Sequence, residues 1–153
     1  MYPLRRALSV AVAATSLVPL TTSCQIRAHE ETAFVRRTAG ISLLRPTLAA
    51  GEALIEVRNE SVEPARIVLA RLDDPRIQLP VSDGVVPVGD ASELEYHGHG
   101  YQVVAKPDDI APYFAHGRTR TTLHVHLSRG FYLLFSNRPG HYTAGRHVLL
   151  RVQ

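Results

Sequence analysis

The chain contains many short stretches in which apolar and polar residues alternate. Successive side chains of a strand point to opposite faces, so such a stretch predicts a strand with one buried face. Residues 53–59 (ALIEVRN) alternate in this way, and so do residues 121–127 (TTLHVHL), where His124 and His126 share the polar face. Further strands are predicted at FVRR (34–37), ISLL (41–44), RIVLARL (66–72), YQVVAK (101–106), GFYLLFS (130–136) and HVLLRV (147–152). Many short strands separated by turn residues predict an all-β sandwich or barrel.

Two segments interrupt this pattern. Residues 107–116 (PDDIAPYFAH) predict one short helix that begins near Asp108. Residues 73–100 are rich in Pro, Gly and Asp and form a long connection. Connections of that length are often functional or ordered by packing.

The beginning of the chain is typical of an export signal. Arg5 and Arg6 precede an apolar run from Ala7 to Leu20, and small residues then lead to Cys24. The run is too short to be a dependable membrane span. The segment LTTSC resembles a bacterial lipobox, with its Leu one position further from the cysteine than usual. This predicts a lipoprotein signal over 1–23, lipid on Cys24 and a tether over 24–32. The alternative is an ordinary cleaved signal followed by a chance cysteine, and the export route (Sec or twin-arginine) stays open.

Removing the signal leaves a single domain, predicted at 33–153, which is long enough for a real core. The net charge of +3 includes Arg5 and Arg6, so no basic surface indicates a nucleic-acid partner. Cys24 is the only cysteine, so the domain has no internal disulfide, no zinc–cysteine site and no thiolate nucleophile.

The C-terminal stretch FYLLFSNRPGHYTAG resembles the metal-binding loop of the cupredoxins, the blue-copper sandwiches, and especially the sulfocyanin- and plastocyanin-like forms. A second block, LRPTLAAGEALIEVRNESVEPARIVL, resembles the part of the family in which a strand ends in Asn and a histidine follows six residues later. The resemblance covers residues 41–72 and 119–153 and implies a Greek-key β-sandwich of cupredoxin type.

Three of the four ligand positions that the resemblance implies have lost their ligand type. The upstream histidine falls on Ala65, the cysteine on Ser136 and the methionine on Arg146, while the loop histidine is kept as His141. Blue copper needs a thiolate and two imidazoles with a weak axial group. A protonated alcohol is a poor ligand, and arginine places a cation where the metal would bind. We therefore expect no blue-copper cofactor. Ser136 and His141 also suggest a nucleophile and base, but no nucleophile elbow surrounds Ser136, so no enzyme is expected.

The histidines leave a second hypothesis open. His97 and His99 flank a glycine in a predicted loop, and His124 and His126 lie on one strand face. Two imidazoles that are two residues apart on one strand face can bind the same Cu(II) or Zn(II) ion. The metal site in this hypothesis draws on these four residues and His141; the simpler interpretation is a polar strand face and a surface loop.

These patterns predict an exported, lipid-anchored binding or accessory protein outside the cytoplasm, without a blue-copper centre. The alternative is a histidine-based copper or zinc carrier of the cell envelope. The lipid on Cys24 would attach the protein to the membrane, and an envelope protein partner is left open.

Overall fold

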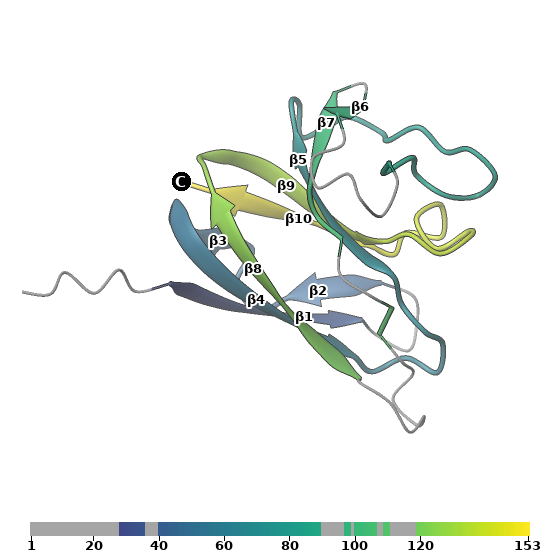
Figure 1. The fold of residues 1–153 in the computed structure, drawn as a ribbon, viewed down its shortest axis with the longest axis horizontal. Coiled ribbons are helices and arrows are strands. Elements are labelled where there is room, and N and C mark those ends of the chain that lie inside the picture. Colours follow the sequence, from purple (N-terminus) through teal and green to yellow (C-terminus); the bar gives the residue numbers. More distant parts are fainter. Residues whose placement is uncertain (1–27, 36–39, 90–96, 99, 107–108, 111–118) are drawn as a thin grey trace, which may run out of the picture.

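The computed structural model describes residues 28–35, 40–89, 97–98, 100–106, 109–110 and 119–153. These residues form two β-sheets that face each other (Figure 1). The strands are β1 (His29–Val35), β2 (Ile41–Leu43), β3 (Thr47–Leu48), β4 (Gly51–Asn59), β5 (Ile67–Leu72), β6 (His97–Gly98), β7 (Tyr101–Ala105), β8 (Arg120–Leu127), β9 (Gly130–Ser136) and β10 (His147–Val152).

The first sheet has the order β2-β1-β4-β8 and the second the order β3-β10-β9-β5-β7-β6. Within the described residues the pairs β1–β4 and β3–β10 are parallel, and the other neighbours are antiparallel. The predicted all-β sandwich is confirmed. Every predicted strand is present, although the first begins earlier than FVRR, whose last two residues lie outside the described residues.

Two features differ from the sequence prediction, and a third lies largely outside the described residues. The tether was expected to reach residue 32, but His29–Thr32 pair with β4 and belong to the sandwich. The short strands β3 and β6 were not predicted, because two residues are too few to show a period. Most of the predicted helix at 107–116 lies outside the described residues; of its two described residues, Ile110 forms a bridge with Ala65. The part of the chain that the structure describes contains no helix that is long and apolar enough to cross a membrane.

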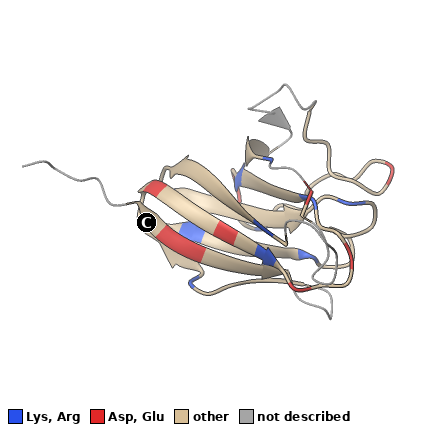
Figure 2. Cartoon of the chain, turned by 60° about the horizontal axis from the view of Figure 1, so that its bottom comes forward, with Lys and Arg blue, Asp and Glu red and all other residues tan. Residues whose placement is uncertain are grey.

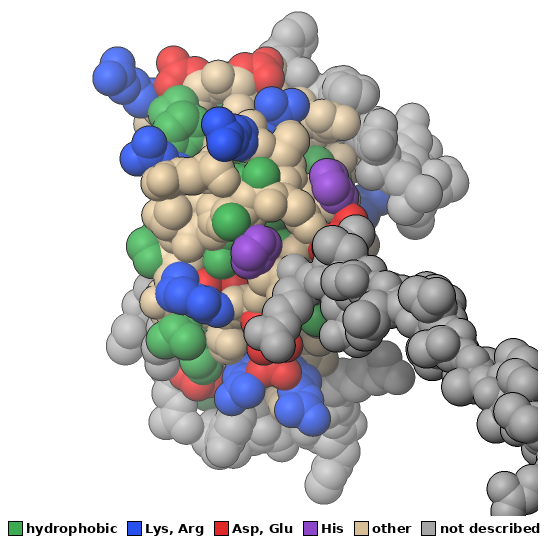
Figure 3. All heavy atoms as spheres, turned by 90° about the vertical axis from the view of Figure 1, so that its left-hand side faces the viewer, with side chains coloured by type: hydrophobic (Ala, Val, Ile, Leu, Met, Phe, Trp, Pro, Cys, Tyr) green, Lys and Arg blue, Asp and Glu red, His purple; other side chains and the backbone are tan. Residues whose placement is uncertain are grey.

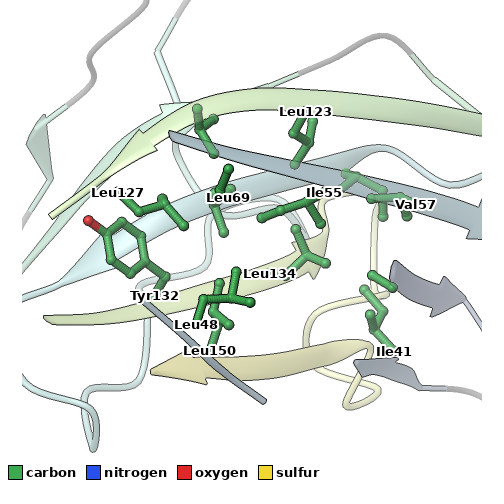
Figure 4. Close-up of a cluster of buried hydrophobic side chains, with 14 of the residues drawn as sticks. Ile41, Leu48, Ile55, Val57, Leu69, Leu123, Leu127, Tyr132, Leu134 and Leu150 are labelled. Atoms are coloured by element: carbon green, nitrogen blue, oxygen red, sulfur yellow. The ribbon is translucent and has the colours of Figure 1, made fainter. Parts of the chain in front are cut away.

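The main core lies between the two sheets (Figure 4). The strand period of two explains its composition, because β4 and β8 each bury every second side chain. The side chains shown in the close-up include Ile55, Val57, Leu123, Leu127, Leu69, Leu134, Leu150 and Tyr132.

A second apolar layer covers the outer face of the second sheet. β5 and β9 bury residues on both faces, so their sequences read as continuous apolar runs rather than as alternation. Leu79 and Val86, from the connection after β5, pack onto this face beside Phe135. The long connection is thus ordered by packing over its described part.

The outer face of the first sheet is polar instead. In the cartoon of Figure 2, acidic and basic residues are interspersed along neighbouring strands. Glu56 contributes to this pattern, because it pairs with Arg58 and lies 3.9 Å from Arg120. Over its described residues this face therefore carries charges of both signs.

Candidate functional site

The loop between β9 and β10 closes one end of the sandwich. Gly140 and Gly145 have φ angles of 78° and 81°, a left-handed conformation that favours glycine. The His141 N–H donates to Arg138 O at 2.9 Å, and the Ser136 N–H donates to Arg146 O at 3.0 Å. This turn brings Ser136 and Arg146 opposite each other and folds His141 back toward them.

Three of the four positions implied by the family resemblance meet at this point. Ser136 Oγ lies 2.8 Å from His141 Nδ1. Arg146 Nη1 lies 3.4 Å from Nδ1 and 3.3 Å from Nε2 of the same imidazole. The guanidinium is almost equidistant from the two ring nitrogens, so it lies against the ring rather than at the end of one hydrogen bond. The Ser136 side chain is fully buried, whereas the side chains of His141 and Arg146 are each 13% exposed.

The fourth position, Ala65, contributes only a methyl group. It is fully buried, and its backbone exchanges hydrogen bonds with Ile110 at 2.9 and 2.7 Å. The next carbonyl, Arg66 O, accepts a hydrogen bond from the Asn137 N–H at 2.6 Å, which ties this segment to the end of β9. The backbone is thus held beside the loop, but no ligating atom projects from it.

Glu63 supplies the acidic group of this site, and it was not predicted from the sequence. Its Oε2 lies 2.6 Å from Arg146 Nη2 and 3.4 Å from His141 Nε2. The turn that presents it is built by Asn59, whose side-chain amide donates to Glu63 O at 2.8 Å. Ser61 Oγ donates to Asn59 Oδ1 at 2.7 Å, which fixes the same turn. The only available signal was the position of Glu63, two residues before Ala65.

The charges at this site shift two pKa values. The hydrogen bond and charge of Arg146 lower the pKa of Glu63 below its ordinary value, with smaller contributions from His141 and Arg138. Burial is the main cause that lowers the pKa of His141, and the charge of Arg146 adds to it, against the opposing effect of Glu63. The favoured state is therefore a neutral imidazole next to a Glu63–Arg146 ion pair.

These groups do not fit a blue-copper ion. Ser136 offers a hydroxyl in place of a thiolate, and Ala65 offers no donor. The neutral His141 has one ring nitrogen with a lone pair, and Ser136 can donate its proton to Nδ1. Arg146 is a permanent cation against the same ring. A metal here would lack ligands and would meet a positive charge.

A second group of ion pairs, more exposed to solvent, lies at the same end of the sandwich as the β9–β10 loop. Asp109 Oδ1 accepts from Arg66 Nε at 2.8 Å, and its Oδ2 accepts from Arg138 Nη1 at 3.1 Å. All three side chains are a third or more exposed, so these bonds add little stability on their own. They do link the β9–β10 loop to the segment before β5.

His124 and His126 do not join this site. His124 and His126 are exposed on β8, on the outer face of the first sheet, and His126 Nδ1 lies 2.8 Å from Glu52 Oε1. His97 lies in β6, where only its backbone is described, and His99 and Cys24 lie outside the described residues. Among the residues that the structure describes, no group of three or more His, Cys, Asp or Glu side chains could hold a metal ion. Figure 3 shows one face on which histidines stand apart from each other among charges of both signs.

Comparison with known proteins adds structural evidence only. No protein-family model matches the sequence, and no curated protein matches it. Among solved structures, reduced rusticyanin is 17% identical with a TM-score of 0.54, over 81% of this chain and 78% of its own. Rusticyanin from Thiobacillus ferrooxidans is also 17% identical, with a TM-score of 0.52 over 81% of this chain and 76% of its own. Auracyanin A, described as a "blue" copper protein from Chloroflexus aurantiacus, is 16% identical with a TM-score of 0.50, over 83% of this chain and 100% of its own.

At these identities the likeness concerns the fold. The two facing sheets are those of a cupredoxin-type β-sandwich, as the loop sequence had suggested.

Proposed function

We propose that this chain is an exported, lipid-anchored binding or accessory protein with a cupredoxin-like scaffold and no blue-copper centre. One observation carries the copper-free part of the proposal: the guanidinium of Arg146 lies against His141 and pairs with Glu63 at 2.6 Å. The export signal and Cys24 in the sequence support the lipid-anchored part. In this arrangement the loop is closed by an ion pair and by the Ser136–His141 bond, which are interactions within the chain. The scaffold is then available to bind something else through its surfaces.

An enzymatic role fits the geometry poorly. Ser136 and His141 are bonded at 2.8 Å, as a nucleophile and base would be. The Ser136 side chain is fully buried, so no substrate carbonyl can reach its Oγ. The pair serves better as a hydrogen bond that fastens the loop to the end of β9.

A copper titration tests the main proposal. The measurement uses Cys24→Ala protein, which contains no thiol, and records metal stoichiometry and the visible absorption spectrum. We expect no intense copper–thiolate charge-transfer band and no tight stoichiometric site. The triple variant Ala65→His, Ser136→Cys, Arg146→Met, made in the same background, is the positive control. An intense blue colour in the parent protein would show that the loop holds copper after all.

The alternative function is a histidine-based copper or zinc carrier. His124 and His126 favour it, because they are exposed on the same face and Glu52 lies beside one of them. The test compares Cu(II) and Zn(II) affinity in the parent with that of His124→Ala/His126→Ala and of His97→Ala/His99→Ala. We expect no specific affinity to depend on either pair. Micromolar or tighter binding of one ion, lost with either pair, would favour the carrier over the scaffold.

A further inference from the structure

A hollow of about 540 Å³ opens on the outer face of the second sheet. It lies where the covering segment, residues 75–81, meets the β9–β10 loop and β10. Leu79 and Leu133 line it, and both are buried, so its floor is apolar. The volume falls within the range of sites that bind small molecules, about 300–1,000 Å³.

Exposed apolar residues gather around this hollow. The described part of the chain has four large hydrophobic side chains that are clearly exposed, and two of them, Val81 at 40% and Leu149 at 37%, line the hollow. Leu149 belongs to the outer face of β10. An apolar ligand in the hollow would cover both side chains and so complete the layer that already covers β5 and β9.

The walls are fixed by specific contacts. The Leu79 N–H donates to the Tyr142 hydroxyl at 3.0 Å, which joins the covering segment to the loop. The Tyr142 ring packs against His147, with centroids 5.1 Å apart. On the other side Ile77 packs directly over Gly100, where a Cβ atom would lie 2.1 Å from Ile77 Cδ1. The hollow is therefore formed without a ligand, which lowers the free energy needed to order a binding site.

Arg76 is the permanently charged residue that lines the hollow, and no acidic residue does so among the described residues. The nearest acid in sequence, Asp74, accepts the Arg76 backbone N–H at 2.8 Å. An apolar floor beside an exposed arginine is complementary to a molecule with an apolar body and an anionic head.

We propose that this hollow binds a small amphipathic carboxylate, with its apolar body over Leu133 and Leu149 and its carboxylate at Arg76. This inference deepens the proposed binding role and rests on it, since it names the class of ligand. The hollow uses neither His141 nor Arg146, so its test is separate from the copper titration.

Decanoate, kept below its micelle concentration, is the probe, and decyltrimethylammonium is the cationic counterpart of matched length. Affinity is measured by calorimetry on the full chain as the cells process it, and the site is located by amide chemical-shift changes. We expect saturable binding of decanoate, shifts centred on Leu79, Thr143 and Leu149, and at least about tenfold weaker binding of the cation, as the loss of one charge-assisted bond implies.

Arg76→Gln and Leu149→Ser should each weaken decanoate binding, the first by about tenfold. Both residues are exposed, so circular dichroism should show unchanged folding. The matched controls are Arg71→Gln and Leu44→Ser, exposed residues outside the hollow, and neither should change the affinity.

Three results would overturn the inference: no saturable decanoate binding, equal binding of the cation, or unchanged affinity in Arg76→Gln and Leu149→Ser. Any of these, with copper still absent, would refute the ligand class and leave the copper-free scaffold standing. A blue-copper spectrum would refute the scaffold proposal without affecting the hollow.

Discussion

Asn137 holds the long connection against the sandwich, so its replacement by alanine is a sharp test of the structure. Its Oδ1 accepts from the Val86 N–H and its Nδ2 donates to Val86 O, both at 2.8 Å. Asn137 is 4% exposed and Val86 is 1% exposed. Asn137→Ala removes both bonds and leaves two backbone groups of Val86 unpaired and away from water.

The expected loss of stability follows from those two groups. A buried donor or acceptor left without a partner costs about 1–3 kcal/mol, so with two such groups Asn137→Ala should lower the free energy of unfolding by about 2–6 kcal/mol. Urea denaturation followed by circular dichroism measures this loss. The m-value should stay constant, because the folded state keeps the same core.

The control is Thr143→Val, in the same loop. Thr143 Oγ1 donates to Gly140 O at 3.0 Å, but this bond is exposed. Water can replace it, so the change should stay within about 0.5 kcal/mol. A loss below about 1 kcal/mol for Asn137→Ala would mean that water reaches the Val86 backbone and that the connection is held by other contacts.

Three further predictions concern the loop, the pH dependence and the anchor. His141→Ala should lower stability by about 1 kcal/mol in urea titrations, because the Ser136 hydroxyl loses its partner; no change would show that the bond is not formed. The folded-state pKa of His141 is lowered from 6.5 and that of Glu63 from 4.5, so the unfolded chain binds protons first. Stability should therefore fall as the pH drops below 6.5 and fall further below 4.5. Arg146→Gln should weaken this pH dependence, because the charge of Arg146 lowers both pKa values. Denaturation midpoints at several pH values, for the parent and the variant, measure both effects. Cys24→Ala should release the protein from membranes or block its processing, and unchanged partitioning of a correctly processed variant would contradict the lipoprotein prediction.

The strands were predictable because their signal is local. β4 and β8 each have one buried and one exposed face, so alternation marks both their existence and their inward side chains. β5 and β9 were found as apolar runs, but only the structure shows why: the connection after β5 covers their second face. β1 was placed too late in the chain, because its first residues pair through the backbone without an apolar pattern.

The site was predictable where it follows a continuous motif. Ser136, His141 and Arg146 belong to one loop, and the resemblance of that loop to the cupredoxin metal-binding loop implied that they lie together. Glu63 belongs to a different turn, and its carboxylate reaches Arg146 because Asn59 and Ser61 shape that turn. Such a contact depends on side-chain direction across two segments, which no spacing in the sequence specifies.

The position of β1 sets a distance between the two ends of the molecule. The described chain enters the sandwich at one end, and β1 runs toward the end that carries the β9–β10 loop (Figure 1). At that far end Val35 O accepts the N–H of Glu60, in the segment that leads to Glu63. Seven residues of strand span about 20 Å. β1 therefore separates the Glu63–Arg146 end of the sandwich by about that length from the end at which the described chain begins, and a lipid on Cys24 would be connected through the chain to the latter end.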